Sequence, residues 1–265
     1  QRAIVARTFQ KSQSKAGAAR RPLPPLFNFL RLGFEGQCIL LAQRGVEPRM
    51  HQGKHGLQVF DEMARLLLEV GPHVISESPE FAQKIGVIAA SWSQAEVNLN
   101  CLFAILLDTT PEDATKELKK HGSAAKATSR ARIIAAETLK GAELDSLIEI
   151  LNRLEDARLK RNRVQHDVWA RKAGDNHRLF AVHANDYLDL ATKTMAVAES
   201  DAGLAIEFAM AFTTEVSNGY SLEDLENIAT EIVSISKSLL NAMFHRIGLR
   251  LAEIHAPDRI HHTTD

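Results

Sequence analysis

EFAQKIGVIAASWSQAEVNLNCLFAILLD, residues 80–108, carries the strongest structural signal in this chain of 265 residues. Apolar residues recur at every third or fourth position, at Ile85, Ile88, Trp92, Ala95, Leu99, Leu102 and Leu106. This spacing places them on one face of an α-helix, and such a face is buried against neighbouring elements. The stretch therefore predicts a long helix in a mainly α-helical protein.

Further helices are expected on both sides of this stretch. Helical spacing of apolar residues over 57–70 ends at Gly71-Pro72 and predicts a helix. Thr110-Pro111-Glu112-Asp113 combines an N-cap residue, a proline at the first helical position and an acid three residues after the cap, so a short helix to about Lys120 should follow. Helical bias continues over 123–139 and 142–170.

The pattern changes after Ala173-Gly174-Asp175. Residues 178–184 and 204–212 have the composition of strands, although the second stretch fits a helix equally well. A capping box at Ser221 and Asp224 then predicts a last long helix that reaches about Ala252. The order of elements predicts a helical bundle with a small β-like insertion after the 142–170 helix.

Charge divides the chain into two parts. Residues 1–55 hold ten Lys or Arg and two Glu and lack sustained periodicity, which leaves the remainder formally at −9. We interpret residues 1–55 as a basic, flexible extension, with an arm that contacts RNA phosphates or a transit sequence as alternatives. The folded domain is expected to span residues 56–265.

Composition excludes several classes of protein. No window of about 18 consecutive apolar residues exists, so a membrane-spanning helix is not expected. Cys38 and Cys101 are far apart, which argues against a disulfide framework or a thiolate zinc site and suits the cytoplasm. His51 and His55 lie in a glycine-interrupted stretch without a nearby third ligand, so no metal site is expected. No P-loop, dinucleotide-binding or nucleophile-elbow motif occurs, and we expect no cofactor.

RNRVQHDVW, residues 161–169, interrupts the apolar pattern of the helix predicted over 142–170. One stripe of that helix contains Ile150, Leu154, Ala157, Arg161, Val164 and Val168. Arg161 must extend its guanidinium to an edge of the bundle or find an anionic partner, because an unpaired buried charge costs several kcal/mol. Asn162 and His166 are four residues apart and share a face, with Arg161 beside them.

These three residue types suit RNA cleavage without a metal. The ribose 2′-hydroxyl is the nucleophile in that reaction, so the protein must supply a base that titrates near neutrality. Histidine is the residue type that provides one, which makes His166 the candidate base. Arg161 can stabilise the charge that develops on the phosphate, since its planar fork matches two oxygens. Asn162 would orient the imidazole or bind the phosphate.

Residues 161–166, RNRVQH, resemble the RNxxxH form of the motif of the HEPN superfamily, which are helical-bundle proteins that include many metal-independent endoribonucleases. Trp92 and Glu96 on the upstream helix, Trp169 after the motif, the hairpin-like insertion and the late helix extend this resemblance over about residues 80–250. It implies that Arg161 and His166 are the catalytic pair, that Asn162 supports them, and that two copies of the chain bring their motifs together. Related sequences often have glycine where this chain has Asp167, which would orient His166 or repel phosphate.

The surroundings of the motif suggest supporting residues. Arg158, Lys160 and Arg163 belong to a local basic stretch over 153–178 and are expected to bind RNA. Glu96 is expected to face Arg161 across the bundle, and a core ion pair without catalysis is the competing interpretation.

The leading hypothesis for function is a metal-independent endoribonuclease. It would act as a homodimer on RNA, as a toxin with an antitoxin partner or as a phage-defence component. The alternatives are a non-catalytic module that binds RNA, a nucleotide or a protein, and a motif that only stabilises a dimer.

Overall fold

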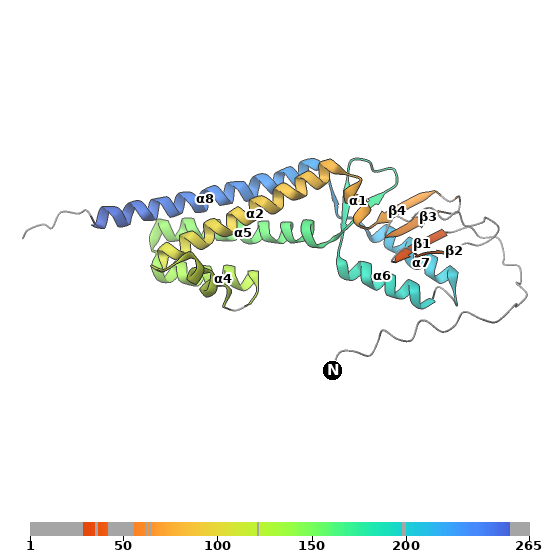
Figure 1. Cartoon of the computed structure of the whole chain (residues 1–265), viewed down its shortest axis with the longest axis horizontal. Helices are drawn as coiled ribbons and strands as arrows, with labels where there is room; N and C mark the ends of the chain where they lie inside the picture. The colour runs from red at the N-terminus through yellow and green to blue at the C-terminus, as the bar shows by residue number, and fades with distance from the viewer. Residues whose placement is uncertain are drawn as a thin grey trace, which may run out of the picture.

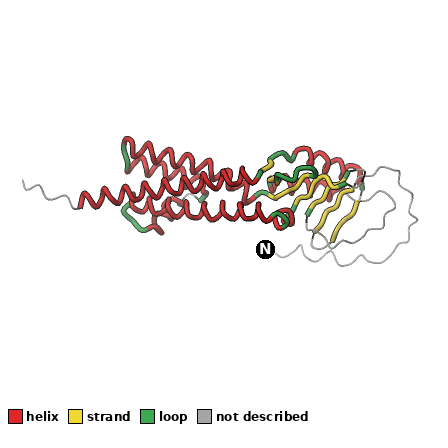
Figure 2. Tube along the Cα trace, turned by 90° about the horizontal axis from the view of Figure 1, so that it is seen from above, coloured by secondary structure: helices red, strands yellow, loops and turns green. Residues whose placement is uncertain are grey.

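The computed structural model describes residues 29–34, 37–41, 56–61, 63, 65–120, 122–197 and 200–254. The described part is elongated, with a bundle of long helices at one end and an antiparallel sheet with two covering helices at the other (Figure 1). Figure 2 shows the same division from above, with the long helices running along the axis of the molecule and the strands gathered at one end. The protein is thus mainly α-helical, with one antiparallel sheet among the described residues.

Three long helices form the bundle. They are α2 (Pro79–Leu106), α5 (Gly141–His166) and α8 (Leu222–Ile254). Contacts between α2 and α8 advance along both helices, from Lys84 with Glu226 to Asn98 with Ser236, so these two helices run parallel. The α5 helix runs antiparallel to α8, and two short helices, α3 (Pro111–Lys119) and α4 (Ala124–Thr138), close the bundle beside it.

The apolar stripe of residues 80–108 forms the centre of the bundle, as predicted. Ile88, Trp92, Ala95, Leu99 and Leu102 are buried. They pack in one cluster with Leu147, Ile150, Leu151 and Leu154 of α5 and Ile228, Ile232, Ile235 and Leu239 of α8. The predicted caps are also present, because Thr110 accepts a hydrogen bond from the Asp113 amide, and Ser221 and Asp224 bond to each other's amides.

The sheet draws its strands from separate parts of the chain. In spatial order they are β2 (Gln37–Leu41), β1 (Phe29–Phe34), β3 (Leu57–Phe60), β4 (Leu66–Val70), β5 (Val168–Lys172), β6 (Leu179–Val182) and β7 (Gly219–Tyr220), and every neighbouring pair is antiparallel. Helix α1 (Pro72–Ser76) connects β4 to α2.

The two faces of the sheet join two different cores. One face carries Leu68, Ala170 and Phe180, which pack against α6 (Ala184–Val197) and α7 (Ala202–Glu215). Side chains that alternate with these in sequence, such as Trp169 and Ala181, belong to the core of the helical bundle. Strands β5 and β6 therefore hold the two ends of the molecule together.

The structure corrects the prediction for residues 57–70, which form the β3–β4 hairpin and not a helix. Asp61 starts the turn, where its carboxylate accepts hydrogen bonds from the amides of Met63 and Arg65. Short apolar runs fit a helix or a buried strand equally well, and pairing with β1 and β5 decides the outcome.

Three further predictions need adjustment. Strands β1 and β2 lie within residues 1–55 and join the same sheet as β3, so the folded part of the chain begins before residue 56. Residues 204–212 lie in helix α7, where Asp201 caps the start by accepting from the Leu204 amide. The hairpin β5–β6 after the motif helix exists, but it belongs to this larger sheet and is not a small separate insertion.

Candidate functional site

Arg161 lies on the buried stripe of α5, as the sequence predicted. Ile150, Leu154, Ala157 and Val164 on the same stripe are buried, whereas Arg161 is half-buried. Its guanidinium carbon lies 5.8 Å from the centre of the Trp92 ring, a distance at which the ring attracts the cation. An aromatic face of α2 therefore takes the place of the expected anionic partner.

The polar partners of Arg161 are the other two residues of the motif. Its Nη1 donates to Asn162 Oδ1 at 3.0 Å and lies 3.3 Å from Nε2 of His166. In the neutral tautomer with the proton on Nδ1, Nε2 of His166 accepts this bond. Nε of Arg161 is buried and has no hydrogen bond within the described residues. The three side chains thus form one cluster, in which the arginine has no carboxylate partner within the part of the chain that the structure describes.

The end of α5 exposes this cluster to solvent. His166 is the last residue of the helix, and Asp167 is extended, with φ −76° and ψ 155°. The side chain of His166 is exposed, and that of Asn162 is half-buried. Asn162 accepts the Arg161 hydrogen bond through its oxygen, and its amide nitrogen donates to no other described residue, so it can donate to a ligand.

Asp167 makes no hydrogen bond to His166 within the described residues. Its carboxylate, which is 7% exposed, accepts from Nε of Arg163 at 3.2 Å. The neighbouring Tyr220 packs edge-on against Trp169, and burial raises the pKa of its hydroxyl. Asp167 and Arg163 therefore compensate each other on the side of α5 that faces Tyr220.

The residues expected to bind RNA have different surroundings. Arg158 is bound to Glu155 at 2.6 Å, and this hydrogen bond lowers the pKa of Glu155. Arg163 is bound to Asp167, as described above. Lys160 is exposed and lines a surface depression with Tyr220 and Glu231. Two of the three cations are thus paired with a carboxylate three or four residues away in the chain.

The expected contact between Glu96 and Arg161 is not formed, and that prediction is wrong. Glu96 is exposed and has no ion pair within the described residues, so a core Glu–Arg pair is excluded as well. Trp92 lies one turn earlier on α2 and occupies the position over the guanidinium. Glu96 instead lines a pocket between α2, α3, α4 and α5.

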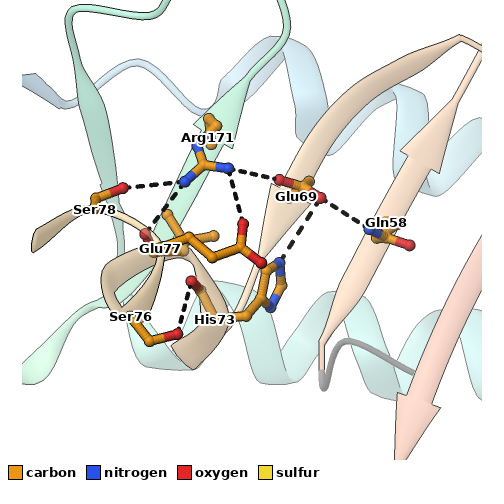
Figure 3. A network of polar contacts seen from close by, with 8 residues as sticks. Gln58, Glu69, His73, Ser76, Glu77, Ser78 and Arg171 are labelled. Atoms are coloured by element: carbon orange, nitrogen blue, oxygen red, sulfur yellow. Dashed lines mark hydrogen bonds and ion pairs between the residues drawn. The ribbon is translucent and has the colours of Figure 1, made fainter. Parts of the chain in front are cut away.

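A second arginine site was missed by the sequence analysis. Arg171 of β5 binds two carboxylates through Nη1, those of Glu69 on β4 and Glu77 after α1, both at 3.2 Å (Figure 3). Its Nη2 donates to the hydroxyl of Ser78 at 3.0 Å and to the carbonyl of Val74 at 3.4 Å. Arg171 therefore fixes α1 and the start of α2 to the sheet.

Glu69 is the buried member of this Arg171 network. It is 3% exposed, and it also accepts from Nε2 of Gln58 at 2.9 Å, while Nε2 of His73 lies 3.9 Å away. A single acid in the apolar strand LLLEV could have signalled a buried ion pair, since a buried carboxylate requires compensation. Its partner Arg171 is 102 residues away in the chain and was not predictable from local pattern.

Comparison with known proteins gives no match to a family model, a curated protein or a solved structure. Within the described residues, no helix combines the length and apolarity needed to cross a membrane. The same residues contain no group of three or more His, Cys, Asp or Glu side chains placed to hold a metal ion.

Proposed function

We propose that this chain is a metal-independent endoribonuclease of HEPN type, with Arg161, Asn162 and His166 as its active site. One observation carries the proposal: within the described residues a half-buried arginine has no carboxylate partner, and one of its polar partners is an exposed imidazole. The charge of such an arginine is not compensated by an acid and can bind an anionic ligand. The parallel N–H groups of its guanidinium match two oxygens of a phosphate diester. The imidazole beside it can move a proton at neutral pH.

The proposed reaction divides the work between these residues. The ribose 2′-oxygen attacks phosphorus while its proton passes to His166, so the bond from the 2′-oxygen to phosphorus forms and the bond to the 5′-oxygen breaks. Arg161 turns from His166 to the non-bridging oxygens and stabilises their charge, and the Asn162 amide donates to the same group. The 5′-oxygen leaves with a proton from His166 of a second copy, giving a 2′,3′-cyclic phosphate and a 5′-hydroxyl.

A non-catalytic binding module is the second candidate. The observation in its favour is that Arg161 occupies the Nε2 lone pair that a base would use. In that case the Arg161 cluster would bind an RNA phosphate and leave the chain intact. The two candidates differ in one measurable outcome, which is the formation of cyclic phosphate ends.

The test is to incubate the purified chain with end-labelled RNA in excess chelator and to identify the new ends. Cleavage with 2′,3′-cyclic phosphate ends should be lost in His166→Ala and Arg161→Ala. His177→Ala and Arg178→Ala are matched controls, because both residues are exposed and lie outside the Arg161 cluster. RNA binding without cleavage in the wild type would favour the second candidate, and cleavage that persists in both cluster variants would refute the assignment.

The biological part of the proposal is a toxin or phage-defence role with an antitoxin protein as partner. Expression of the wild-type chain should then arrest bacterial growth, while expression of His166→Ala should not. Equal growth with both chains would contradict this role without affecting the test of cleavage.

A further inference from the structure

A pocket of about 560 Å³ lies beside the Arg161 cluster and is lined by residues of α2, α3, α4 and α5. This volume falls in the range of about 300–1,000 Å³ that is usual for small-molecule sites. Leu99, Leu118 and Leu154 supply an apolar floor. Trp92 connects the pocket to the Arg161 cluster, because it lines the pocket and its ring also contacts the guanidinium of Arg161.

Glu96 gives this pocket its chemical preference. Three charged side chains line it. Arg158 is paired with Glu155, and Lys119 is exposed at the end of α3, whereas Glu96 on α2 has no hydrogen bond or ion pair within the described residues. An ionised carboxylate only accepts hydrogen bonds and has two oxygens side by side. The ligand that suits it must therefore present two adjacent N–H donors on a flat, largely apolar body.

Among the four RNA bases, guanine alone has two adjacent donors on its Watson–Crick edge, at N1 and N2. Adenine and cytosine place one amino group beside an acceptor, and uracil has one N–H between two acceptors. An acceptor-only carboxylate therefore binds guanine and repels the acceptor edges of the other three. Single-stranded RNA is commonly recognised in this way, through hydrogen bonds to the edge of an unstacked base that packs against apolar and aromatic side chains.

We infer that this pocket selects a guanine next to the scissile phosphate, with Glu96 as the specificity-determining residue; the inference rests on the proposed ribonuclease function. Arg158, which lines the pocket, precedes Arg161 by three residues, or about 4.5 Å along the axis of α5. A base in the pocket and a phosphate at Arg161 are thus close enough to belong to one nucleotide or to two neighbours.

Binding can be measured without cleavage. The chain has two tryptophans, so Trp169→Phe leaves Trp92 as the only fluorescent indole. Guanosine 3′-monophosphate should change its emission, with an affinity at least about tenfold higher than for the adenosine, cytidine and uridine monophosphates. Glu96→Gln in this background should remove the preference, because the amide replaces one acceptor with a donor. Glu137→Gln, an exposed change on α4 outside the pocket, is the matched control.

Cleavage of a random-sequence RNA provides the second measurement. Wild-type cuts should concentrate beside guanosine, and Glu96→Gln should lower the ratio of cuts beside guanosine to cuts beside adenosine. Cleavage without base preference, equal binding of all four nucleotides, or an unchanged preference in Glu96→Gln would overturn the inference and leave the ribonuclease proposal standing. Selective guanosine binding that depends on Glu96, without any cleavage, would support the pocket and refute the ribonuclease.

Discussion

Arg161 and Arg171 lie on either side of the junction between α5 and β5, and the charges of their partners differ. Arg171 contacts two carboxylates, a hydroxyl and a carbonyl, so its charge is compensated inside the protein. Arg161 contacts an amide oxygen, an imidazole and an indole ring, and no carboxylate within the described residues. Arg171 stabilises the junction between the sheet and the helical bundle, whereas the guanidinium of Arg161 can bind an anionic ligand.

The other three arginines of α5 follow the pattern of Arg171. Arg153 binds Glu231, Arg158 binds Glu155 and Arg163 binds Asp167. A basic stretch of sequence is therefore a poor guide to anion binding until the partners are known. Arg161 differs from these neighbours in its partners and not in its residue type.

The largest expected effect is on cleavage by Arg161→Ala. Loss of the cation should reduce the single-turnover rate on RNA by about 10²- to 10³-fold, since one donor to a developing oxyanion contributes that much. The free energy of unfolding in urea should fall by only about 1 kcal/mol, which reflects the lost contact with Trp92. A loss of stability as large as that of an Arg171 variant would remove the distinction between the two arginines.

Arg171→Met should affect stability most. Removal of the cation leaves the Glu69 carboxylate buried without its main partner, and the free energy of unfolding should fall by about 3 kcal/mol. Adding Glu69→Gln should recover part of this loss, because a neutral amide needs no counterion. Urea titrations of both variants test this, and a double variant less stable than Arg171→Met would contradict the explanation.

Asp167→Asn should have a smaller effect, and on stability alone. Its carboxylate is engaged with Arg163, so the free energy of unfolding should decrease by about 1 kcal/mol while RNA cleavage changes less than about threefold. A large rise in cleavage would instead show that the Asp167 charge repels phosphate. Parallel measurement of unfolding and cleavage in the same buffer separates the two outcomes.

The smallest expected effect concerns acid stability. The hydrogen bond from Arg158 lowers the pKa of Glu155 below its ordinary value of 4.5. The pair therefore stabilises the fold fully above that value, and the contribution, less than about 1 kcal/mol, is lost as pH falls through the lower pKa of the folded state. Glu155→Gln should flatten the decline in unfolding free energy between pH 6 and 3, whereas Arg161→Ala should leave its slope unchanged.

The local sequence pattern was sufficient to predict the structure where the residues of one helix face determine it. The stripe from Ile88 to Leu102 predicted α2, and the caps at Thr110 and Ser221 predicted two helix starts. The same logic identified Arg161 as the interruption of a buried stripe. In each case the signal lies within a few turns of one helix, and the partner surface only has to be apolar.

The local sequence pattern was insufficient where the structure depends on contact with a segment far away in the sequence. Residues 57–70 form strands because β1 and β5 supply the neighbouring edges, which the local sequence does not reveal. Trp92, and not Glu96, meets Arg161 because of a one-turn difference in the position of α2 against α5. The Arg171 network joins residues that local spacing cannot relate.

The pairing of β4 with β5 also has a kinetic consequence. Glu69 and Arg171 are register partners, although 102 residues separate them, so α1 to α5 form a loop that leaves and re-enters the sheet at adjacent strands. Closing so long a loop costs entropy before the strand contacts compensate for it, and such pairings form late in folding. The Arg161 cluster lies immediately before the closing strand. A chain still being synthesised can therefore pair β5 with β4, beside the Arg161 cluster, only after α1 to α5 have been made.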